Sequence, residues 1–495
     1  MHNFTNKVKN LQQKRLIQRE TTTLNQMNTT KIIFTIFVLL AVAQSCEATQ
    51  SVDQDPTPDS DIQIEDQDSD DPEPEPEPDP EPDPYPGLDP APDSPLEYAN
   101  EGKLRTLIPF EAYSTREGYP VIEIEPMIVE NSENVINFLE YGAVADGVSD
   151  DGALMEKAIE QLAKDENGGV LYVPKATYAI SNVELKSNIH IHIEAGTTLK
   201  LPNDTEDHKM FIIGRYSFTN NVVVCGVNGR FTIDISSTTA RPQIFVIKST
   251  HNFMISGFDL YGNKIEYPII TMGMDKDKDP DIFGPTNGVV KDVTTYNSHY
   301  GYGLVQAQTA RKVYFENLHG VGGATLRLET GDQTMNIAQF GGVFDVVGRN
   351  ISCHMGNAAV MVAPHSMQCG VVQIEDIKGV NSGFAARIDG GYVSSSIAAG
   401  NPDVVDGTYA DGSYVADIEG VFGMTAQVKS KHFKYMPTSL IPTGEATGDS
   451  GLYEECPSVA CVLLDDINYT LDVLGDVVAT GYLVPDIVTE EYSEE

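Results

Sequence analysis

Short runs of β-branched and apolar residues recur every 20 to 30 residues through most of the chain, and Gly, Asn or Asp separates them. Residues of this kind favour β-strands. The clearest runs are 188–194, 221–235, 252–260, 288–296, 312–318, 342–353, 370–380 and 417–428. Because no single run can close a hydrophobic core, the pattern predicts strands that stack on one another as a solenoid.

One helix is predicted at the start of this array, over residues 152–164, with Asp150 or Asp151 as its cap. Its apolar residues share one face at helical spacing: Leu154, Ala158, Ile159 and Leu162. The later strands have no helices between them and few two-residue hairpin turns, which disfavours a doubly wound sheet and a sandwich. The sequence therefore predicts an all-β fold, a right-handed parallel β-helix with a short N-terminal capping helix.

Composition separates the chain into three parts, and the middle part is the most unusual. Residues 47–100 contain 19 Asp or Glu, no Lys or Arg, and alternating acidic residues and prolines. Such a segment buries too little apolar surface to fold, and like charges keep it extended. We expect a disordered linker between residues 1–46 and a folded domain over 101–495. An acidic tail that binds Ca²⁺ or docks a partner would have the same composition.

A twelve-residue apolar run, 32–43, follows Lys31. It is too short to span a bilayer but suits the hydrophobic region of a signal peptide, with Met27 as a better start than Met1. The small residues before Cys46 resemble a bacterial lipoprotein signal. We expect lipidation of Cys46 and an outer-membrane or cell-surface location. Plain secretion is the alternative, because Ala43 stands where such signals usually carry Leu.

The charge balance excludes one class of partner. The formal net charge is −41, and because residues 1–46 contribute +5 and 47–100 contribute −19, residues 101–495 carry −27. A domain this acidic does not bind nucleic acid by general electrostatics. A polyanionic substrate would need local clusters of Arg or Lys, or high salt that screens the repulsion.

The cysteines indicate no zinc site, because no Cys/His spacing is of the kind that binds zinc. Besides Cys46, the chain contains Cys225, Cys353, Cys369, Cys456 and Cys461. The number is odd, so at least one is free or paired between chains. Residues 456 and 461 are close enough in sequence to form a disulfide across a loop. The other three lie in apolar runs, as small buried hydrophobic residues do.

Polar residues with catalytic potential gather between positions 297 and 389. In Leu326-Arg-Leu-Glu329, strand alternation places Arg327 and Glu329 outward on one face. A carboxylic acid can protonate the leaving oxygen of a glycosidic bond, and a guanidinium can bind a sulfate or carboxylate of the sugar. A simple surface ion pair has the same spacing and is more common.

Five further positions in this stretch are candidates. His365 follows a proline at a turn, and Gln306 and Tyr302 belong to Gly301-Tyr-Gly-Leu-Val-Gln306, where small residues allow a ligand close to the backbone. Arg387 and Asp389 alternate outward on another strand. Each is weak evidence alone, since a lone histidine is more often structural. From spacing alone, Glu329, His365 and Gln306 are candidates for catalysis, and Arg327, Arg387, Asp389 and Tyr302 are candidates for contact with a substrate.

Taken together and in order, these motifs resemble the iota-carrageenases, glycoside hydrolase family 82. The resemblance runs from about residue 134 to the 457–471 region. The residues that carry it are 287–290, Asn297, 301–306, 317–319, 322–330, 341–342, Cys353, 358–361 and 364–365.

This resemblance implies a right-handed β-helix that hydrolyses β-1,4 bonds of iota-carrageenan, a sulfated red-algal galactan, with inversion. Glu329 matches the family's general acid, His365 a histidine that assists cleavage, and Gln306 a glutamine that holds an ion or water. We expect no required cofactor, structural Ca²⁺ or Na⁺ with unidentified ligands, and a chloride near Gln306. We expect the polysaccharide to be the binding partner and the protein to be a monomer. Any contact with a membrane would be made through the lipid attached to Cys46.

The sequence departs from the family at the general base. The family pattern reads Glu-Thr-Asp, and same-face positions i and i+2 lie roughly 6.6 Å apart along a strand, near the separation of roughly 6.5–9.5 Å in inverting enzymes. Here that position is Gly331, and the carboxylate follows at Asp332. We predict Asp332 as the catalytic base, which requires that Gly331 permit a bulge or turn that swings its carboxylate back to the face of Glu329. Asp389, or a water held by Gln306 and His365, is the competing assignment.

Three alternative functions remain open from sequence alone. A polysaccharide lyase can use the same fold, because a fold does not determine a chemistry. A pectin-type hydrolase is disfavoured because Arg387-Ile-Asp389 has no lysine and no Gly-His-Gly occurs. A carrageenan-binding lipoprotein that has lost its base at Gly331 is the non-enzymatic alternative.

Overall fold

The computed structural model describes residues 104–107, 116–203, 205–274, 284–300, 302–444, 446 and 451–494. The chain divides into two compact units, Met1–Pro80 and Glu81–Glu495, and every described residue belongs to the second. The predicted leader, Cys46 and the acidic linker lie outside the described residues. In the described part, no helix is both long enough and apolar enough to cross a membrane.

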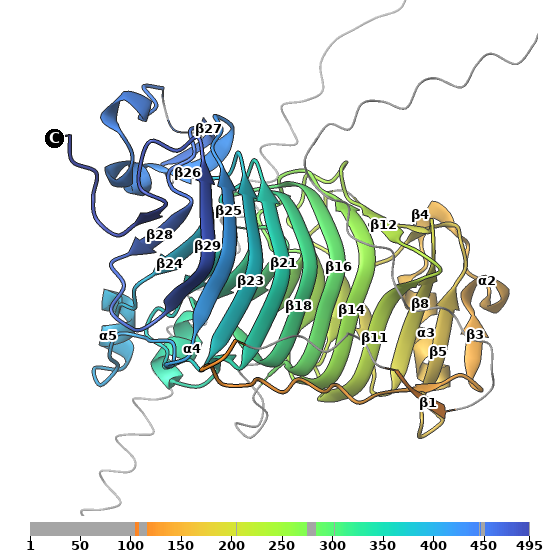
Figure 1. Ribbon diagram of the computed structural model, residues 1–495. Coiled ribbons are helices and arrows are strands. Elements are labelled where there is room, and N and C mark those ends of the chain that lie inside the picture. Colours follow the sequence, from red (N-terminus) through yellow and green to blue (C-terminus); the bar gives the residue numbers. More distant parts are fainter. Residues whose placement is uncertain are drawn as a thin grey trace, which may run out of the picture. The chain divides into compact units, whose positions relative to one another are not determined.

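Two long parallel sheets form the walls of a β-helix, and the coils stack along its axis (Figure 1). In order, the sixteen-stranded sheet has along its main path β3 (Val135–Asn137), β5 (Gly169–Val173), β8 (Ile189–Glu194), β11 (Thr219–Val227), β14 (Thr250–Tyr261), β16 (Thr286–Ser298), β18 (Thr309–Gly322), β21 (Val346–His354), β23 (Val372–Val380), β25 (Tyr414–Val421) and β29 (Asp472–Thr480).

The ten-stranded sheet forms the opposite wall. It comprises β7 (Val183–Leu185), β10 (Lys209–Ile213), β13 (Gln243–Ile247), β15 (Ile270–Met272), β17 (Val305–Ala307), β19 (Ala324–Glu329), β22 (Ala358–Ala363), β24 (Phe384–Asp389), β28 (Val462–Asp465) and β30 (Ile487–Val488). Strands branching from the first sheet are β4 (Asp146–Asp150), β6 (Thr177–Ala179), β9 (Thr198–Lys200), β12 (Phe231–Asp234) and β20 (Gly342–Phe344).

The remaining elements lie outside the two walls. Two antiparallel pairs are β1 (Leu104–Leu107) with β2 (Ile128–Asn131), and β26 (Ala426–Lys429) with β27 (Leu452–Cys456). The helices are α2 (Phe138–Tyr141), α3 (Gly152–Leu162), α4 (Gln333–Ala338) and α5 (Ser395–Gly400), with the 3-10 turns η1 (Ser430–Tyr435) and η2 (Thr438–Leu440).

The predicted fold is confirmed: the walls are parallel, and α3 packs at the N-terminal end of the stack (Figure 1). Of the two predicted caps, Asp151 is the N-cap residue of α3, but its carboxylate forms no capping bond and accepts from Val144 N and Ala145 N instead. Gly152 N, in the first turn, donates to Asp150 Oδ1 at 2.9 Å. The buried face includes Met155 in place of the predicted Leu154, which is only partly buried.

The core fills the space between the walls with stacked side chains. Phe211 stacks on Phe245 with ring centroids 5.2 Å apart, and Phe245 meets Phe258 at 5.5 Å. All three are fully buried. Each coil places an apolar side chain above the equivalent side chain of the preceding coil. Neighbouring coils therefore bury apolar surface that a single coil would leave exposed.

Asparagines with positive φ mark the bend of successive coils in the longer sheet. Asn188, Asn221, Asn252 and Asn287 have φ between 51° and 62°, a left-handed conformation that Asn tolerates better than most residues. Their side chains form a ladder: Asn221 Nδ2 donates to Asn188 Oδ1 at 3.1 Å, and Asn287 Nδ2 to Asn252 Oδ1 at 2.6 Å. This explains why Asn punctuates the strand runs in the sequence.

A segment before the β-helix crosses the outside of the coils. We call residues 116–131 the strap. The asparagine ladder binds the strap backbone at every second residue, through Glu125 N to Asn287 Oδ1 (3.2 Å), Met127 N to Asn252 Oδ1 (3.3 Å) and Val129 N to Asn221 Oδ1 (2.9 Å). The strap is orange in Figure 1 and runs beside the green strands. Sequence patterns gave no indication of it.

The strap buries a second apolar cluster on the outer face of the long sheet. Its isoleucines 122, 124 and 128 pack with Val223, Met254, Val289 and Tyr314. At the far end Arg116 forms ion pairs with Glu375 (3.1 Å) and Asp417. The strap is therefore part of the folded domain.

The predicted disulfide between Cys456 and Cys461 is not formed. Within the described residues all five cysteines are free and buried. Cys456 belongs to the β27 side of the domain, while Cys461 contributes to the main core. Burial raises the pKa of both thiols to about 12, so both behave as small apolar residues, as predicted for the other three.

Candidate functional site

Four neighbouring strands of the shorter wall bring the candidate residues into one row. Gln306 on β17 pairs with Arg327 on β19, Arg327 with Met361 on β22, and Met361 with Arg387 on β24. Adjacent strands are about 4.8 Å apart, so the two arginines are separated by about 9.6 Å along the stack. The parallel register of the coils thus aligns residues 81 positions apart in the sequence.

Glu329 ends β19 and lies between three cationic or hydrogen-bonding partners. Its Oε2 forms an ion pair with Arg327 Nη2 and lies 3.5 Å from Gln306 Nε2. Its Oε1 is 3.3 Å from His365 Nε2. The Glu329 side chain is 14% exposed and that of Arg327 is 11% exposed. The predicted outward pair is therefore a largely buried ion pair with access to solvent.

Burial by itself would raise the pKa of Glu329, but the Arg327 charge and the His365 hydrogen bond lower it further than burial raises it. The net effect holds the pKa well below its usual range. In the ligand-free protein, Glu329 is therefore a carboxylate. Protonation of Glu329 near neutral pH would require that one of these contacts be weakened.

His365 is held in an unusual backbone conformation. Its φ is +47°, and its carbonyl accepts hydrogen bonds from Tyr392 N (2.7 Å) and Gly407 N (2.9 Å). The Tyr392 ring packs against the imidazole with centroids 5.1 Å apart. Strained residues persist only where surrounding contacts hold them, and they concentrate at functional sites.

These side chains line a cleft of about 780 Å³. Of the predicted residues, it includes Gln306, Tyr302, Arg327, Glu329, His365 and Arg387. Its lining also contains Glu266, His299, Tyr300, Gln308, Gly331, Asn357, Met361, Lys429, Lys431 and Leu452. The structure thus brings six of the eight predicted site residues together.

The other two, Asp389 and Asp332, are not among the residues that line the cleft. Asp389 binds Arg387 with both oxygens, at 3.0 Å from Nε and 3.0 Å from Nη2. Arg387 Nη1 also donates to Asn357 Oδ1 at 3.1 Å. Burial would lower the pKa of Arg387, but Asp389 raises it above its usual value. Asp389 therefore orients an arginine.

Asp332 forms the N-cap of α4. Its Oδ1 accepts a hydrogen bond from Met335 N at 2.9 Å, with φ −67° and ψ 118°. The strand ends at Glu329, so no bulge turns Asp332 back toward the carboxylate before it. The position that faces the cleft is Gly331: a Cβ there would lie 3.3 Å from His365 Nε2. The backbone at Gly331 is outside the left-handed region, so an aspartate can adopt it.

Sequence reasoning missed two basic residues that line the cleft. Lys429 ends β26 and Lys431 belongs to η1, and both line the cleft. Burial and the neighbouring charges of Lys431, Arg387 and Arg327 lower the pKa of Lys429. Its Nζ lies 5.0 Å from the Tyr300 ring centroid. The sequence did contain a signal for this basic cluster, because three lysines and a histidine occur within residues 429–434 of an otherwise acidic chain.

Glu266 is the second carboxylate among the residues lining the cleft. Its side chain is 52% exposed and forms an ion pair with Arg241 at 3.3 Å. No group of three metal-ligating side chains lies in the cleft within the described part of the chain. The predicted chloride site near Gln306 is not tested by this geometry.

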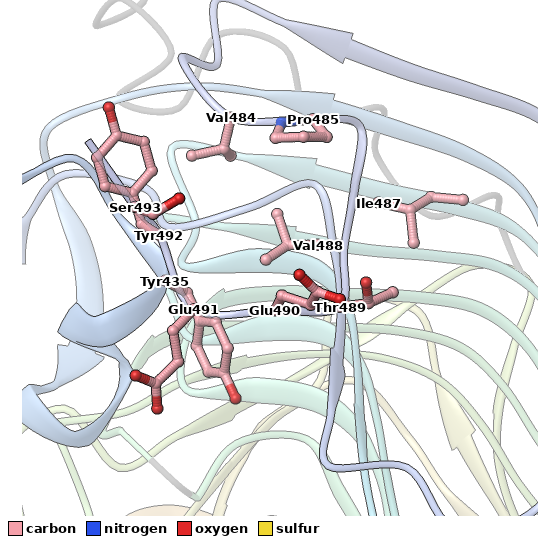
Figure 2. Close-up of a pocket in the computed structure, with 10 residues that line it drawn as sticks. All are labelled: Tyr435, Val484, Pro485, Ile487, Val488, Thr489, Glu490, Glu491, Tyr492 and Ser493. Carbon is pink, nitrogen blue, oxygen red and sulfur yellow. The ribbon is translucent and has the colours of Figure 1, made fainter. Parts of the chain in front are cut away.

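A second hollow, of about 330 Å³, lies beside the C-terminal strand. Figure 2 shows it, lined by Tyr435 and by residues from Val484 to Ser493. Lys434 near it pairs with Glu491 at 3.5 Å. This hollow contains none of the predicted site residues, and the cleft over β17–β24 is the candidate site.

Comparison with known proteins agrees with the fold. Residues 135–341 match a sequence family described as rhamnogalacturonase A/epimerase, pectate lyase-like. An iota-carrageenase of Alteromonas macleodii is 31% identical over 51% of this chain and 52% of its own length. An iota-carrageenase of Zobellia galactanivorans is 31% identical over 53% of this chain and 54% of its own. The chain thus matches about half the length of these relatives.

Among solved structures, one named as a sulfated-galactose 4-galactohydrolase is 25% identical, with a TM-score of 0.65. It covers 75% of this chain, and the match spans 92% of that structure. The resemblance to the iota-carrageenases is confirmed. An iota-carrageenase solved with iota-carrageenan fragments, 23% identical with a TM-score of 0.66 over 78% of this chain and 96% of its own, shares the fold. The shared fold thus extends beyond the half of the chain covered by the sequence matches.

Proposed function

We propose that this protein is an endo-acting glycoside hydrolase that cleaves β-1,4 linkages of iota-carrageenan with inversion. The observation that carries the proposal is Glu329, buried between Arg327 and His365 in a cleft with several cationic side chains. The names of the curated relatives and of the galactohydrolase structure support the substrate class.

The cleft has the charge that a sulfated polymer requires. Arg327 and Arg387 lie in one row of the shorter wall, and Lys429 of β26 and Lys431 of η1 also line the cleft. These four cations gather in a domain whose net charge is −27. Guanidinium groups bind sulfate with paired hydrogen bonds, whereas lysines act as point charges. The cleft thus supplies the local cationic cluster that an acidic protein needs to hold a polyanion.

Binding of the substrate would also prepare Glu329 to act as an acid. A sulfate on Arg327 would neutralise the charge that keeps Glu329 ionised, and burial would then favour the protonated form. Glu329 could next donate its proton to the glycosidic oxygen as the bond to the leaving sugar breaks. Arg327 thus couples recognition of the sulfate to protonation of the acid.

The nucleophile in this proposal is a water molecule in the space beside Gly331, and because no carboxylate stands at that position the water gives up its proton to solvent water. A carboxylate at 331 would reach this space, and His365 Nε2 borders it. His365 and Gln306 would orient the water for attack at the anomeric carbon. We do not assign Asp332 as base, because it caps α4 and does not line the cleft.

The glycine itself favours a second candidate function, a carrageenan-binding protein of low or no activity. Incubation with iota-, kappa- and lambda-carrageenan separates the two. We expect reducing ends from the iota form and product anomers of inverted configuration by NMR. Tight binding of iota-carrageenan without reducing ends, at every enzyme concentration, would leave only the binding function. Products that absorb in the ultraviolet would instead indicate a lyase.

A pair of lysine variants tests the cationic rim. Lys431→Gln should weaken binding of sulfated galactan about threefold to tenfold and reduce its salt dependence. Lys378→Gln removes an exposed lysine of β23, paired with Glu419 at 3.4 Å and outside the cleft. It should bind like the parent. If both variants lose the same affinity for the sulfated galactan, the attraction comes from the overall charge of the protein and not from the lysine in the cleft.

Export and cofactors remain part of the proposal. We propose a lipid-anchored protein at the cell surface, modified at Cys46, which palmitate labelling of the parent and of Cys46→Ala would test. We also propose that catalysis needs no cofactor beyond an anion such as chloride near Gln306. Activity that survives chelators but falls in chloride-free buffer would support this.

A further inference from the structure

Three buried side chains far from the cleft meet where the strap crosses the first coils. Glu130 on β2 is 1% exposed, and His190 and His192 on β8 are 1% and 2% exposed. One oxygen or nitrogen of each lies within 4.8 Å of the others. None of the three lines the cleft, and the proposed hydrolysis does not use them.

Strand alternation explains why two histidines face the same point. Ile189, Ile191 and Ile193 of β8 point into the main core. The intervening His190 and His192 therefore point to the outer face, which the strap covers. The strap supplies the carboxylate because Asn221 fixes the residue before it, with Val129 N at 2.9 Å and Val129 O at 2.7 Å from the Asn221 amide.

The distances fit a metal ion between the side chains. Zinc binds imidazole nitrogen and carboxylate oxygen at about 2.0–2.1 Å, which places tetrahedral ligand atoms roughly 3.3 Å apart. His192 Nε2 lies 3.2 Å from Glu130 Oε2. The two rings lie side by side, with centroids 6.2 Å apart and planes at 33°. Small side-chain rotations would bring the third ligand to the same separation.

The surroundings of His190 match those of a metal ligand. Its Nε2 lies 3.4 Å from Asn221 Oδ1, and a metal-bound histidine donates its second ring N–H to such an oxygen. In that arrangement His190 would bind the ion through Nδ1. Asn221 would then hold both the strap backbone and the ligand ring.

We propose that Glu130, His190 and His192 bind one divalent transition-metal ion, with Zn²⁺ the best fit, and that this ion fastens the strap to the β-helix. Two imidazoles and one carboxylate suit zinc, whereas calcium and magnesium prefer oxygen ligands alone. The buried carboxylate needs a positive charge close by. A protonated His192 alone could supply that charge, but an ion pair would not require the second imidazole.

The test measures metal directly and needs no enzyme activity. The full chain, purified without chelators or metal-affinity resin, is equilibrated with ZnSO₄, dialysed and analysed by mass spectrometry. We expect about one zinc per chain, and a cobalt-substituted form with the visible absorption of a four- or five-coordinate site. Removal of the ion should lower the melting temperature and expose the strap to protease.

Matched variants separate the site from nonspecific binding. Glu130→Gln keeps the shape of the side chain and should abolish stoichiometric zinc and the cobalt spectrum. His319→Gln alters another buried histidine, on β18, whose Nδ1 lies 2.7 Å from Ser352 Oγ. It should retain the metal. Parent protein without stoichiometric zinc or a cobalt spectrum would overturn the proposal, as would full zinc retention in folded Glu130→Gln.

Discussion

Glu329 Oε1 lies 3.3 Å from His365 Nε2, and the same nitrogen lies 3.3 Å from the point where a Cβ at residue 331 would stand. The imidazole thus borders both the proposed acid and the position that carries the base in the iota-carrageenase pattern. One imidazole therefore contacts the proposed acid and the space in which the attacking water is proposed.

The first prediction concerns the acid. Glu329→Gln should lower the rate of reducing-end release about 10²- to 10⁴-fold, because general acid catalysis contributes about that much. Binding of iota-carrageenan should persist, since the amide keeps the shape and the arginines remain. Initial rates and affinity electrophoresis would measure the two effects. A variant as fast as the parent would remove Glu329 from the mechanism.

A second prediction restores the base. Gly331→Asp should raise the rate about 10²-fold, because a positioned carboxylate replaces an unassisted water. Gly331→Asn, of the same size but without basicity, is the control and should give no gain. Rates of both variants on the same iota-carrageenan preparation would be compared with the parent. If both variants are slower than the parent by the same factor, activity requires that no side chain occupy the space beside His365.

A third prediction separates Asp332 from catalysis. Asp332→Ala should lower the free energy of unfolding by about 1 kcal/mol, because it removes the N-cap of α4. The rate per folded molecule should be unchanged. Denaturant titration and initial rates at a temperature below both transitions would check this. A large fall in rate with intact stability would return Asp332 to the role of base.

The fourth prediction follows from the lowered pKa of Glu329. A carboxyl whose pKa is lower in the folded state stabilises the fold above its unfolded pKa, near 4.5, and loses that contribution as pH falls. The difference in unfolding free energy between the parent and Glu329→Gln should therefore be constant from pH 7 to 5 and should shift against the parent below pH 4.5. Denaturant titrations at several pH values would measure it. A pH-independent difference would mean that the ion pair does not form in solution.

The fifth prediction tests the strap. Ile128→Ala should cost about 2–5 kcal/mol of unfolding free energy, since Ile128 is fully buried in the outer apolar cluster. Val121→Ala changes a strap residue that is 66% exposed and should cost less than about 0.5 kcal/mol. Equal small effects would mean that the strap is not docked in solution.

The β-helix could be predicted from sequence because each long wall strand repeats the same apolar run and the same Asn or Asp bend. The strands of the shorter wall were harder to predict, because β15 and β17 have only three residues each. Three residues are too few to show the alternation of apolar and polar positions that identifies a strand. In the cleft, Glu329 and Arg327 were found because they alternate on one strand. Lys429 and Lys431 were missed because they reach the cleft from outside the coils.

The position of the Asp332 side chain could not be predicted from the sequence either. Sequence alone left open whether the glycine before it formed a bulge, and the answer depended on a helix of six residues that begins at Gln333. The grouping of Glu130 with His190 and His192 was equally hidden, because it depends on where the strap docks. Contacts between segments so distant in sequence leave no local pattern.

The strap also sets an order of events during folding. Arg116 is synthesised before its partners Glu375 and Asp417, which follow 259 and 301 residues later. The isoleucines of the strap have no surface to cover until the coils exist, so a segment made early can dock only after much of the β-helix has formed. Contacts this remote in sequence form slowly, and the waiting segment is prone to aggregation meanwhile. A chain truncated after the first coils would therefore leave the isoleucines of the strap exposed to solvent, whereas the complete protein buries them.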